Sequence, residues 1–134
     1  PKERMKAGVE HRIPLSDQVI RVFKLLESHR MSDWVFPNRT NGHHLSSAGM
    51  SSVLKRMSRT DITVHGFRST FRDYIAEKTS TPARIAEAAL AHKLKDKAEA
   101  AYQRGDLIEK RRILMQVWAS YCYQKSEKVV QLRA

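Results

Sequence analysis

The stretch TVHGFRSTF, residues 63–71, places His65 and Arg68 three positions apart beside two phenylalanines. Apolar side chains recur at helical spacing from here to residue 78, which predicts an amphipathic helix over 64–78. The apolar stripe consists of Phe67, Phe71, Tyr74 and Ile75. His65 and Arg68 stand at i and i+3 and therefore share one face of this helix. The pair is either an ordinary helix start or half of a phosphate-binding site, and only the rest of the sequence can distinguish these two interpretations.

Upstream of this helix, the sequence predicts a small β element followed by two helices. Residues 1–14 have the pattern of a hairpin, with two short charged strands around a turn at Gly8. The two helices that follow have Ser/Asp caps and apolar residues at helical spacing. Their expected N-caps are Ser16 or Asp17 for the first and Ser46 or Ser47 for the second.

Downstream, the chain reads as helical almost to its end. Pro82 suits the first helical position of a segment that should end near His92. An alanine-rich helix is expected over 93–104, stopped by Gly105, and Asp106 caps a long last helix. The predicted fold class is therefore mainly α with a small antiparallel β element, in a single domain.

Composition narrows the class of partner. Lys and Arg number 25 against 14 Asp and Glu, which gives a formal net charge of +11 over 134 residues. Such an excess indicates a polyanionic partner, and nucleic acid is the first candidate.

Other classes of protein fit the sequence poorly. Cys122 is the only cysteine, so an internal disulfide or a thiolate metal cluster is excluded, and its apolar helical surroundings predict a small core residue. The chain has no apolar run of membrane-spanning length and opens with no signal-peptide pattern. We therefore expect a cytoplasmic protein with no membrane partner.

Each polar residue that draws attention has an ordinary structural explanation when taken alone. His65 could cap a helix, and a histidine such as His92 is favoured at a helix C-terminus by the helix dipole. Lys6 lies in a polar turn where lysines are usually solvated, and tyrosines such as Tyr102 commonly pack half-buried near helix ends. None of these residues is specific by itself.

Together, these residue types match a known chemistry. Breaking a phosphodiester without a metal requires a nucleophile, cations on the non-bridging oxygens and a proton donor for the leaving oxygen. An arginine can bind two phosphate oxygens at once, and histidines can hydrogen-bond the phosphate or carry protons. A lysine can protonate the leaving 5′ oxygen, and a tyrosine can attack and be held as an ester that conserves the bond for resealing.

Four motifs in a fixed order carry a family resemblance: MKAG at 5–8, HGFR at 65–68, LAH at 90–92 and AYQRGD at 101–106. This order resembles the catalytic domain of the tyrosine recombinases, or phage-type integrases. The segments HRIPLSDQ and RGDLIEKRRILMQVWASYC look similar to integrases of prophages and genomic islands. The combination is specific and spans essentially the whole chain.

The resemblance implies a role for each matching residue. Lys6 is the hairpin lysine, His65 and Arg68 form the His-x-x-Arg pair, His92 is the later histidine and Tyr102 is the nucleophile. The implied reaction is site-specific DNA recombination through a 3′-phosphotyrosyl intermediate, without cofactor or metal.

The resemblance also implies partners and an internal organisation. The partner is double-stranded DNA, bound by a homotetramer on two sites at the nucleoid of a bacterial host. The candidate phosphate contacts are Arg4, Arg39, Arg72, Lys93 and Lys95. The expected parts of this partial catalytic domain are a lysine hairpin (1–14), a helical core (15–123) and a tail that protomers exchange (124–134).

Two departures from the family pattern matter. Ala91 stands where the family commonly has glycine, although a small residue still permits close packing. The family's additional arginine, which lies upstream of the lysine hairpin, has no counterpart here, nor do the DNA-clamping and arm-binding domains. We therefore expect an N-terminally truncated catalytic domain that is a poor enzyme alone.

Two other functions stay open at this point. A non-catalytic helical DNA-binding module would also explain the charge of +11, but it has no need of Tyr102. A type IB topoisomerase uses similar chemistry to relax DNA, whereas the compact spacing from LAH to AYQRGD favours an integrase.

Overall fold

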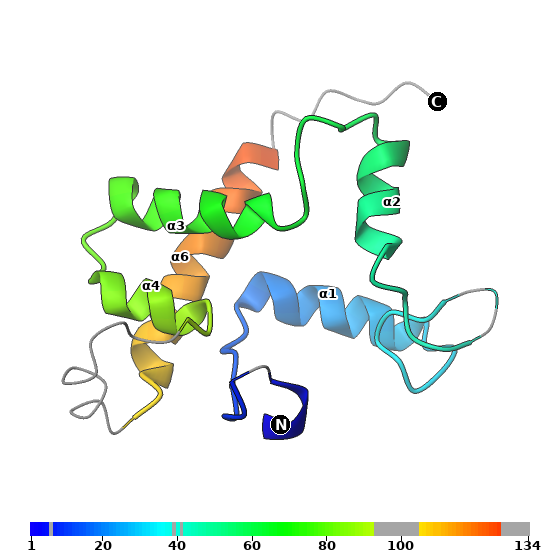
Figure 1. Cartoon of the computed structure of the whole chain (residues 1–134), viewed down its shortest axis with the longest axis horizontal. Helices are drawn as coiled ribbons and strands as arrows, with labels where there is room; N and C mark the ends of the chain where they lie inside the picture. Colours follow the sequence, from blue (N-terminus) through cyan, green and yellow to red (C-terminus); the bar gives the residue numbers. More distant parts are fainter. Residues whose placement is uncertain (6, 39, 41, 93–104, 127–134) are drawn as a thin grey trace.

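The structure, a computed structural model, describes residues 1–5, 7–38, 40, 42–92 and 105–126. Within these ranges the chain forms five α-helices and one short 3-10 helix. The elements are η1 (Lys2–Arg4), α1 (Asp17–Ser28), α2 (Gly49–Arg56), α3 (Gly66–Lys78), α4 (Ala83–Ala89) and α6 (Ile108–Ser126). Helices α3, α4 and α6 gather on one side of the molecule, whereas α2 stands apart on the other (Figure 1). The mainly helical prediction is confirmed.

The core lies where α3, α4 and α6 meet. Its buried side chains are Phe71 and Ile75 from α3, Ile85 and Ala86 from α4, and Leu114 from α6. Trp118 of α6 packs against this cluster and meets Phe71 edge to face, with 5.4 Å between ring centroids. The stripe predicted for residues 64–78 thus faces the core over its second half, while Phe67 at its start remains 49% exposed.

The predicted β-hairpin over 1–14 is wrong: the described residues of this segment form no strand. Lys2–Arg4 is instead a 3-10 turn, and a further turn places Gly8 at a φ of 65°. The apolar residues Val9 and Ile13 of this segment stay 67% and 58% exposed, so the segment buries little apolar surface, and an isolated two-stranded hairpin is marginal in water. The one β-type pairing among the described residues is an isolated bridge between Pro37 and His44.

The helix boundaries follow the predicted caps in part. Ser16 caps α1 by accepting a hydrogen bond from the backbone N–H of Val19 at 3.4 Å. The expected side-chain cap of α2 by Ser46 or Ser47 is wrong, since α2 begins at Gly49 with Ala48 in the cap position and no capping side chain. Pro82 occupies the N-cap of α4 rather than its first turn. The helix expected over 93–104 lies outside the described residues.

Cys122 is exposed on α6, so the prediction that it is a core residue is also wrong. None of the described helices is long and apolar enough to cross a membrane.

A buried arginine connects the N-terminal segment to α6. Arg111 is only 2% exposed; its two terminal nitrogens donate to the carbonyl oxygens of Asp106, at 3.0 Å, and of Arg12. Arg12 in turn forms an ion pair with Asp106, with 2.7 Å between nitrogen and oxygen. These contacts fix Arg12 at the start of α6.

Candidate active site

The first part of the site is the face of α3 that carries Arg68 and Arg72, both of them partly buried. Thr63 caps the start of this helix, because its side-chain oxygen accepts from the backbone N–H of Gly66 at 3.0 Å. His65 occupies the N-cap position with an exposed side chain that makes no capping hydrogen bond. Arg68 and Arg72 follow one turn apart, so α3 presents two guanidinium groups on one face.

The second part of the site is the end of α4. Ala91 adopts a left-handed backbone with a φ of 54°. The N–H of Ala91 bonds the carbonyl of Ala88 at 3.2 Å, and the N–H of His92 bonds the carbonyl of Glu87 at 3.0 Å. This pair of bonds is a Schellman motif, in which glycine is the usual left-handed residue. The motif ends the helix and places His92 directly over Glu87.

Arg68 and His92 meet between these two parts. The Nη2 atom of Arg68 lies 2.8 Å from Nε2 of His92 and donates to the carbonyl oxygen of Leu90 at 2.6 Å. A guanidinium group has donors and no acceptor, so Nε2 of His92 must accept this hydrogen bond. The proton of the neutral ring is therefore on Nδ1, which lies 2.6 Å from Oε2 of Glu87.

Glu87 links this pair to the second arginine of α3. Its other oxygen, Oε1, accepts from Nε of Arg72 at 2.7 Å. The hydrogen bond from Arg72, followed by that from His92, lowers the pKa of Glu87 below its ordinary value. The result is a continuous series of contacts, Arg72–Glu87–His92–Arg68, within which the His92 side chain is 46% exposed.

His11, for which the sequence predicts no role, also reaches this region. Burial lowers the pKa of His11, as do the nearby charges of Arg111 and Arg68, while a hydrogen bond with the backbone of Ala89 raises it. His11 therefore lies between the end of α4 and α6. The only feature of the sequence that pointed to His11 was its place in the HRIPLSDQ segment. That segment does not indicate a contact with Ala89, more than 70 residues away.

The remaining predicted residues are distributed as follows. His65 starts the helix that carries Arg68, and the two are joined by a backbone hydrogen bond of 3.0 Å. Arg4 is exposed in η1, on the N-terminal segment. Lys6, Arg39, Lys93, Lys95 and Tyr102 lie outside the described residues. Among the residues that are described, no group of three His, Cys, Asp or Glu side chains could hold a metal ion.

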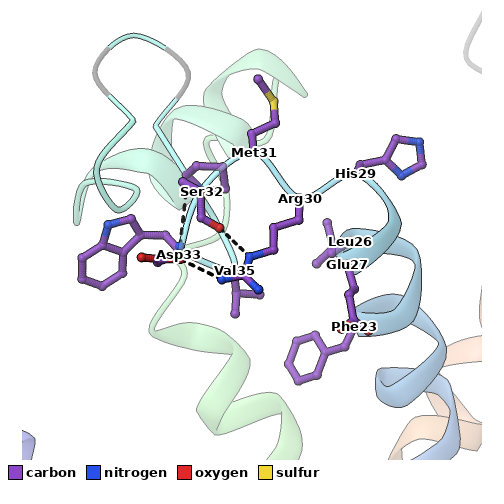
Figure 2. Close-up of a pocket in the computed structure, with 11 residues that line it drawn as sticks. Phe23, Leu26, Glu27, His29, Arg30, Met31, Ser32, Asp33 and Val35 are labelled. Carbon is purple, nitrogen blue, oxygen red and sulfur yellow. Dashed lines mark hydrogen bonds and ion pairs between the residues drawn. The ribbon is translucent and has the colours of Figure 1, made fainter.

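A hollow of about 850 Å³ lies elsewhere, between the end of α1 and the loop that follows it. Figure 2 shows Phe23 and Leu26 on the α1 side and Val35 on the loop side. Its arginine, Arg30, already donates to the Ser32 carbonyl at 3.0 Å and to Asp33 at 2.7 Å. Among the described residues that line this mostly apolar hollow, the one guanidinium group is already paired, so we take the Arg68–His92 pair as the candidate site.

Comparison with known proteins gives the family. The model of the phage integrase family matches residues 3–106. The chain is 34% identical over 122 residues to the prophage integrase IntA of Escherichia coli strain K12, which covers 89% of this chain and 29% of that protein. It is 28% identical to the integrase of Enterobacteria phage P4 over 96% of this chain and 30% of the relative.

The integrase of Shigella phage Sf6 is 30% identical over 90% of this chain and 32% of its own length. The chain thus spans about 30% of the length of these relatives. No solved structure matches. The family model covers the HGFR and LAH motifs that carry Arg68 and His92, and it covers well over half of the sequence. The chain therefore belongs to the phage integrase family of tyrosine recombinases.

Proposed function

We propose that this chain carries the catalytic centre of a site-specific DNA recombinase that integrates or excises a prophage or genomic island. The observation that carries the proposal is the direct contact between Arg68 of α3 and His92 beyond α4. An arginine and a histidine held together at a partly exposed surface, on a chain of net charge +11, suit the binding of a DNA phosphate.

In the proposed reaction, the hydroxyl oxygen of Tyr102 attacks the scissile phosphorus. The bond from phosphorus to the 5′ oxygen breaks, which leaves a 3′-phosphotyrosyl ester and a free 5′ hydroxyl. A histidine of the site takes the proton from Tyr102, and Lys6 supplies the proton to the 5′ oxygen. Attack by a 5′ hydroxyl from another strand reverses these steps and rejoins the DNA.

Arg68 provides the charge stabilisation in this scheme. Its Nη2 is occupied by the carbonyl of Leu90 and by His92, but a phosphate oxygen carries a full charge and is the stronger acceptor. We propose that the guanidinium binds the non-bridging oxygens and that Nε2 of His92 then faces the same phosphate. His65, on the same helix, contributes a second histidine.

The wider proposal concerns partners. The proposed substrate is double-stranded DNA, contacted through Arg4, Arg39, Arg72, Lys93 and Lys95, and the proposed assembly is a tetramer on two DNA sites in the bacterial cytoplasm. Residues 124–134 are proposed as the segment that protomers exchange. Because the chain spans about 30% of the length of its relatives, we also propose that residues 1–134 alone recombine DNA poorly.

A trapping experiment tests the proposed chemistry. Full-length protein is incubated with nicked duplexes of randomised core sequence, in which cleavage releases a short strand and so prevents resealing. We expect a covalent protein–DNA adduct from the wild type and from Tyr123→Phe, a control at a half-exposed tyrosine of α6. Tyr102→Phe should form no adduct and should bind DNA nearly as well, since only one oxygen is removed. An adduct that persists in Tyr102→Phe would contradict the proposal.

A further inference from the structure

We infer that Glu87 is a positioning residue of this site: it holds the His92 ring in the Nδ1–H tautomer and so directs the Nε2 lone pair at Arg68 and the phosphate. The effect of Glu87 on catalysis rests on the proposed function. The positioning of the His92 ring by Glu87 rests on the contacts alone. Glu87 belongs to none of the motifs that identify the family in this sequence.

Glu87 holds His92 at two points. Its backbone carbonyl accepts the His92 N–H at 3.0 Å, as part of the Schellman motif that ends α4. Its side-chain Oε2 lies 2.6 Å from Nδ1 of the same histidine. Main chain and ring are thus both anchored to one residue, which leaves the imidazole little freedom to turn over.

Arg72 fixes the other end of the carboxylate. Nε of Arg72 lies 2.7 Å from Oε1, so each oxygen of Glu87 has a separate partner. Arg72 is one turn from Arg68, and α3 therefore supplies both ends of the series Arg72–Glu87–His92–Arg68. Arg72, a phosphate contact predicted from the sequence, is thus a partner of Glu87 as well.

This arrangement has a consequence for proton transfer. When a phosphate draws the Arg68 guanidinium away, Nε2 of His92 loses its donor while Nδ1 keeps its acceptor. The ring can then take a proton at Nε2 without rotating, and the carboxylate of Glu87 stabilises the imidazolium that forms. A ring free to adopt the Nε2–H form would instead present a proton where the site needs a lone pair.

The tautomer can be observed directly by ¹⁵N NMR of the histidine rings in the 134-residue chain, with His92 assigned by His92→Gln. We expect a protonated Nδ1 in the wild type. Glu87→Ala removes the acceptor, so the Nε2–H form, which predominates in unrestrained histidine, should rise. Glu87→Gln keeps one acceptor oxygen and should give an intermediate fraction of the Nε2–H tautomer of His92. This variant also keeps the test possible if Glu87→Ala does not fold.

Glu77→Ala is the matched control, since Glu77 is an exposed carboxylate on α3, and it should leave His92 unchanged. A His92 ring that stays Nδ1-protonated in both Glu87 variants would overturn the inference.

Cleavage of the nicked duplexes at saturating DNA provides the second readout. Glu87→Gln should slow adduct formation by at least about tenfold, because a misplaced acid–base group loses much of its effect, while DNA affinity stays the same. Glu77→Gln should cleave like the wild type. Cleavage by Glu87→Gln at the wild-type rate would overturn the positioning role. If the wild type forms no adduct although its tautomer responds to Glu87→Ala, the proposed function fails and the positioning of His92 by Glu87 is supported.

Discussion

Helices α2 and α4 end in the same way, but one ends on an open surface and the other beside the candidate active site. Ser58 after α2 and Ala91 after α4 have nearly equal left-handed φ values of 55° and 54°. After α2, Ser58 bonds the carbonyl of Lys55 and Arg59 bonds that of Leu54, at 3.0 and 2.9 Å. These are the same two hydrogen bonds that end α4.

The surroundings of the two helices differ. No residue of α2 is buried, and its apolar residues Met50 and Val53 are 53% and 39% exposed. Helix α4 instead buries Ile85 and Ala86 against α3 and α6. The same helix ending therefore contacts two arginines only after α4, where the packed helix α3 supplies Arg68 and Arg72. After α2, Arg59 merely pairs with Asp61 at an exposed position.

The largest expected difference between the two regions is in stability. Ile75→Ala removes a side chain with 0% exposure from the core and should lower the free energy of unfolding by about 2 to 5 kcal/mol. Val53→Ala on α2 should change it by less than about 0.5 kcal/mol. Urea denaturation followed by circular dichroism measures both. Equal losses would show that α2 is packed as tightly as α3, which would remove the contrast.

A smaller difference is expected in the dependence of stability on pH. The folded pKa of Glu87 is below its ordinary value of 4.5, so its contribution is present above pH 4.5 and is lost as the pH falls through the folded pKa. Glu87→Gln should therefore destabilise the protein at pH 7 and cost progressively less below pH 4.5.

Asp61→Asn is the control, at an exposed ion pair in the connection between α2 and α3. It should change the pH dependence of stability little, because solvent screens an exposed pair. The free energy of unfolding is measured against pH for each protein. If it falls in parallel for Glu87→Gln and wild type from pH 7 to below pH 4.5, the pairing of Glu87 with Arg72 and His92 is contradicted.

The smallest expected effects come from the shared helix ending. Ala91→Gly and Ser58→Gly each relieve a left-handed backbone, which costs an L-residue about 1 kcal/mol or more. Ala91→Gly should raise the global free energy of unfolding by about 0.5 to 1 kcal/mol after the entropy of the unfolded glycine is subtracted. Ser58→Gly should protect only the amides of α2 in hydrogen exchange, because an unpacked helix opens locally. Global stabilisation of the same size by both variants would show that α2 unfolds together with the core.

The sequence predicted the helices well because their apolar periodicity is local. The Ser16 cap of α1 depends on neighbours within one turn and formed as expected. The apolar stripe of α3 faces the core over its second half, whereas Phe67 at its start stays exposed. The strands over 1–14 were predicted from polar residues around a glycine, a pattern that turns share with hairpins. The apolar residues Val9 and Ile13 stay exposed and do not decide between the two, and the described residues form no strand.

The candidate site was only partly predictable. The spacing of His65 and Arg68, and the family resemblance of the LAH motif, indicated which residue types to expect. Sequence alone could not show that Glu87 and His11 reach the same region, since both contacts depend on how α3, α4 and the N-terminal segment pack. One local signal existed: Glu87 stands five residues before His92, the spacing that a Schellman motif closes.

We propose that Arg68 stabilises the transition state of DNA cleavage instead of only anchoring DNA. The most direct measurement is the rate of adduct formation at saturating nicked duplex, beside the affinity for the same DNA. We predict that Arg68→Ala slows cleavage by about 100- to 1000-fold, that Arg68→Lys slows it less, and that affinity changes little in either. Arg30→Ala, at a guanidinium that Ser32 and Asp33 already occupy, should leave both quantities near wild type. Equal losses of affinity and cleavage rate in Arg68→Ala would contradict the claim and reduce Arg68 to a phosphate anchor.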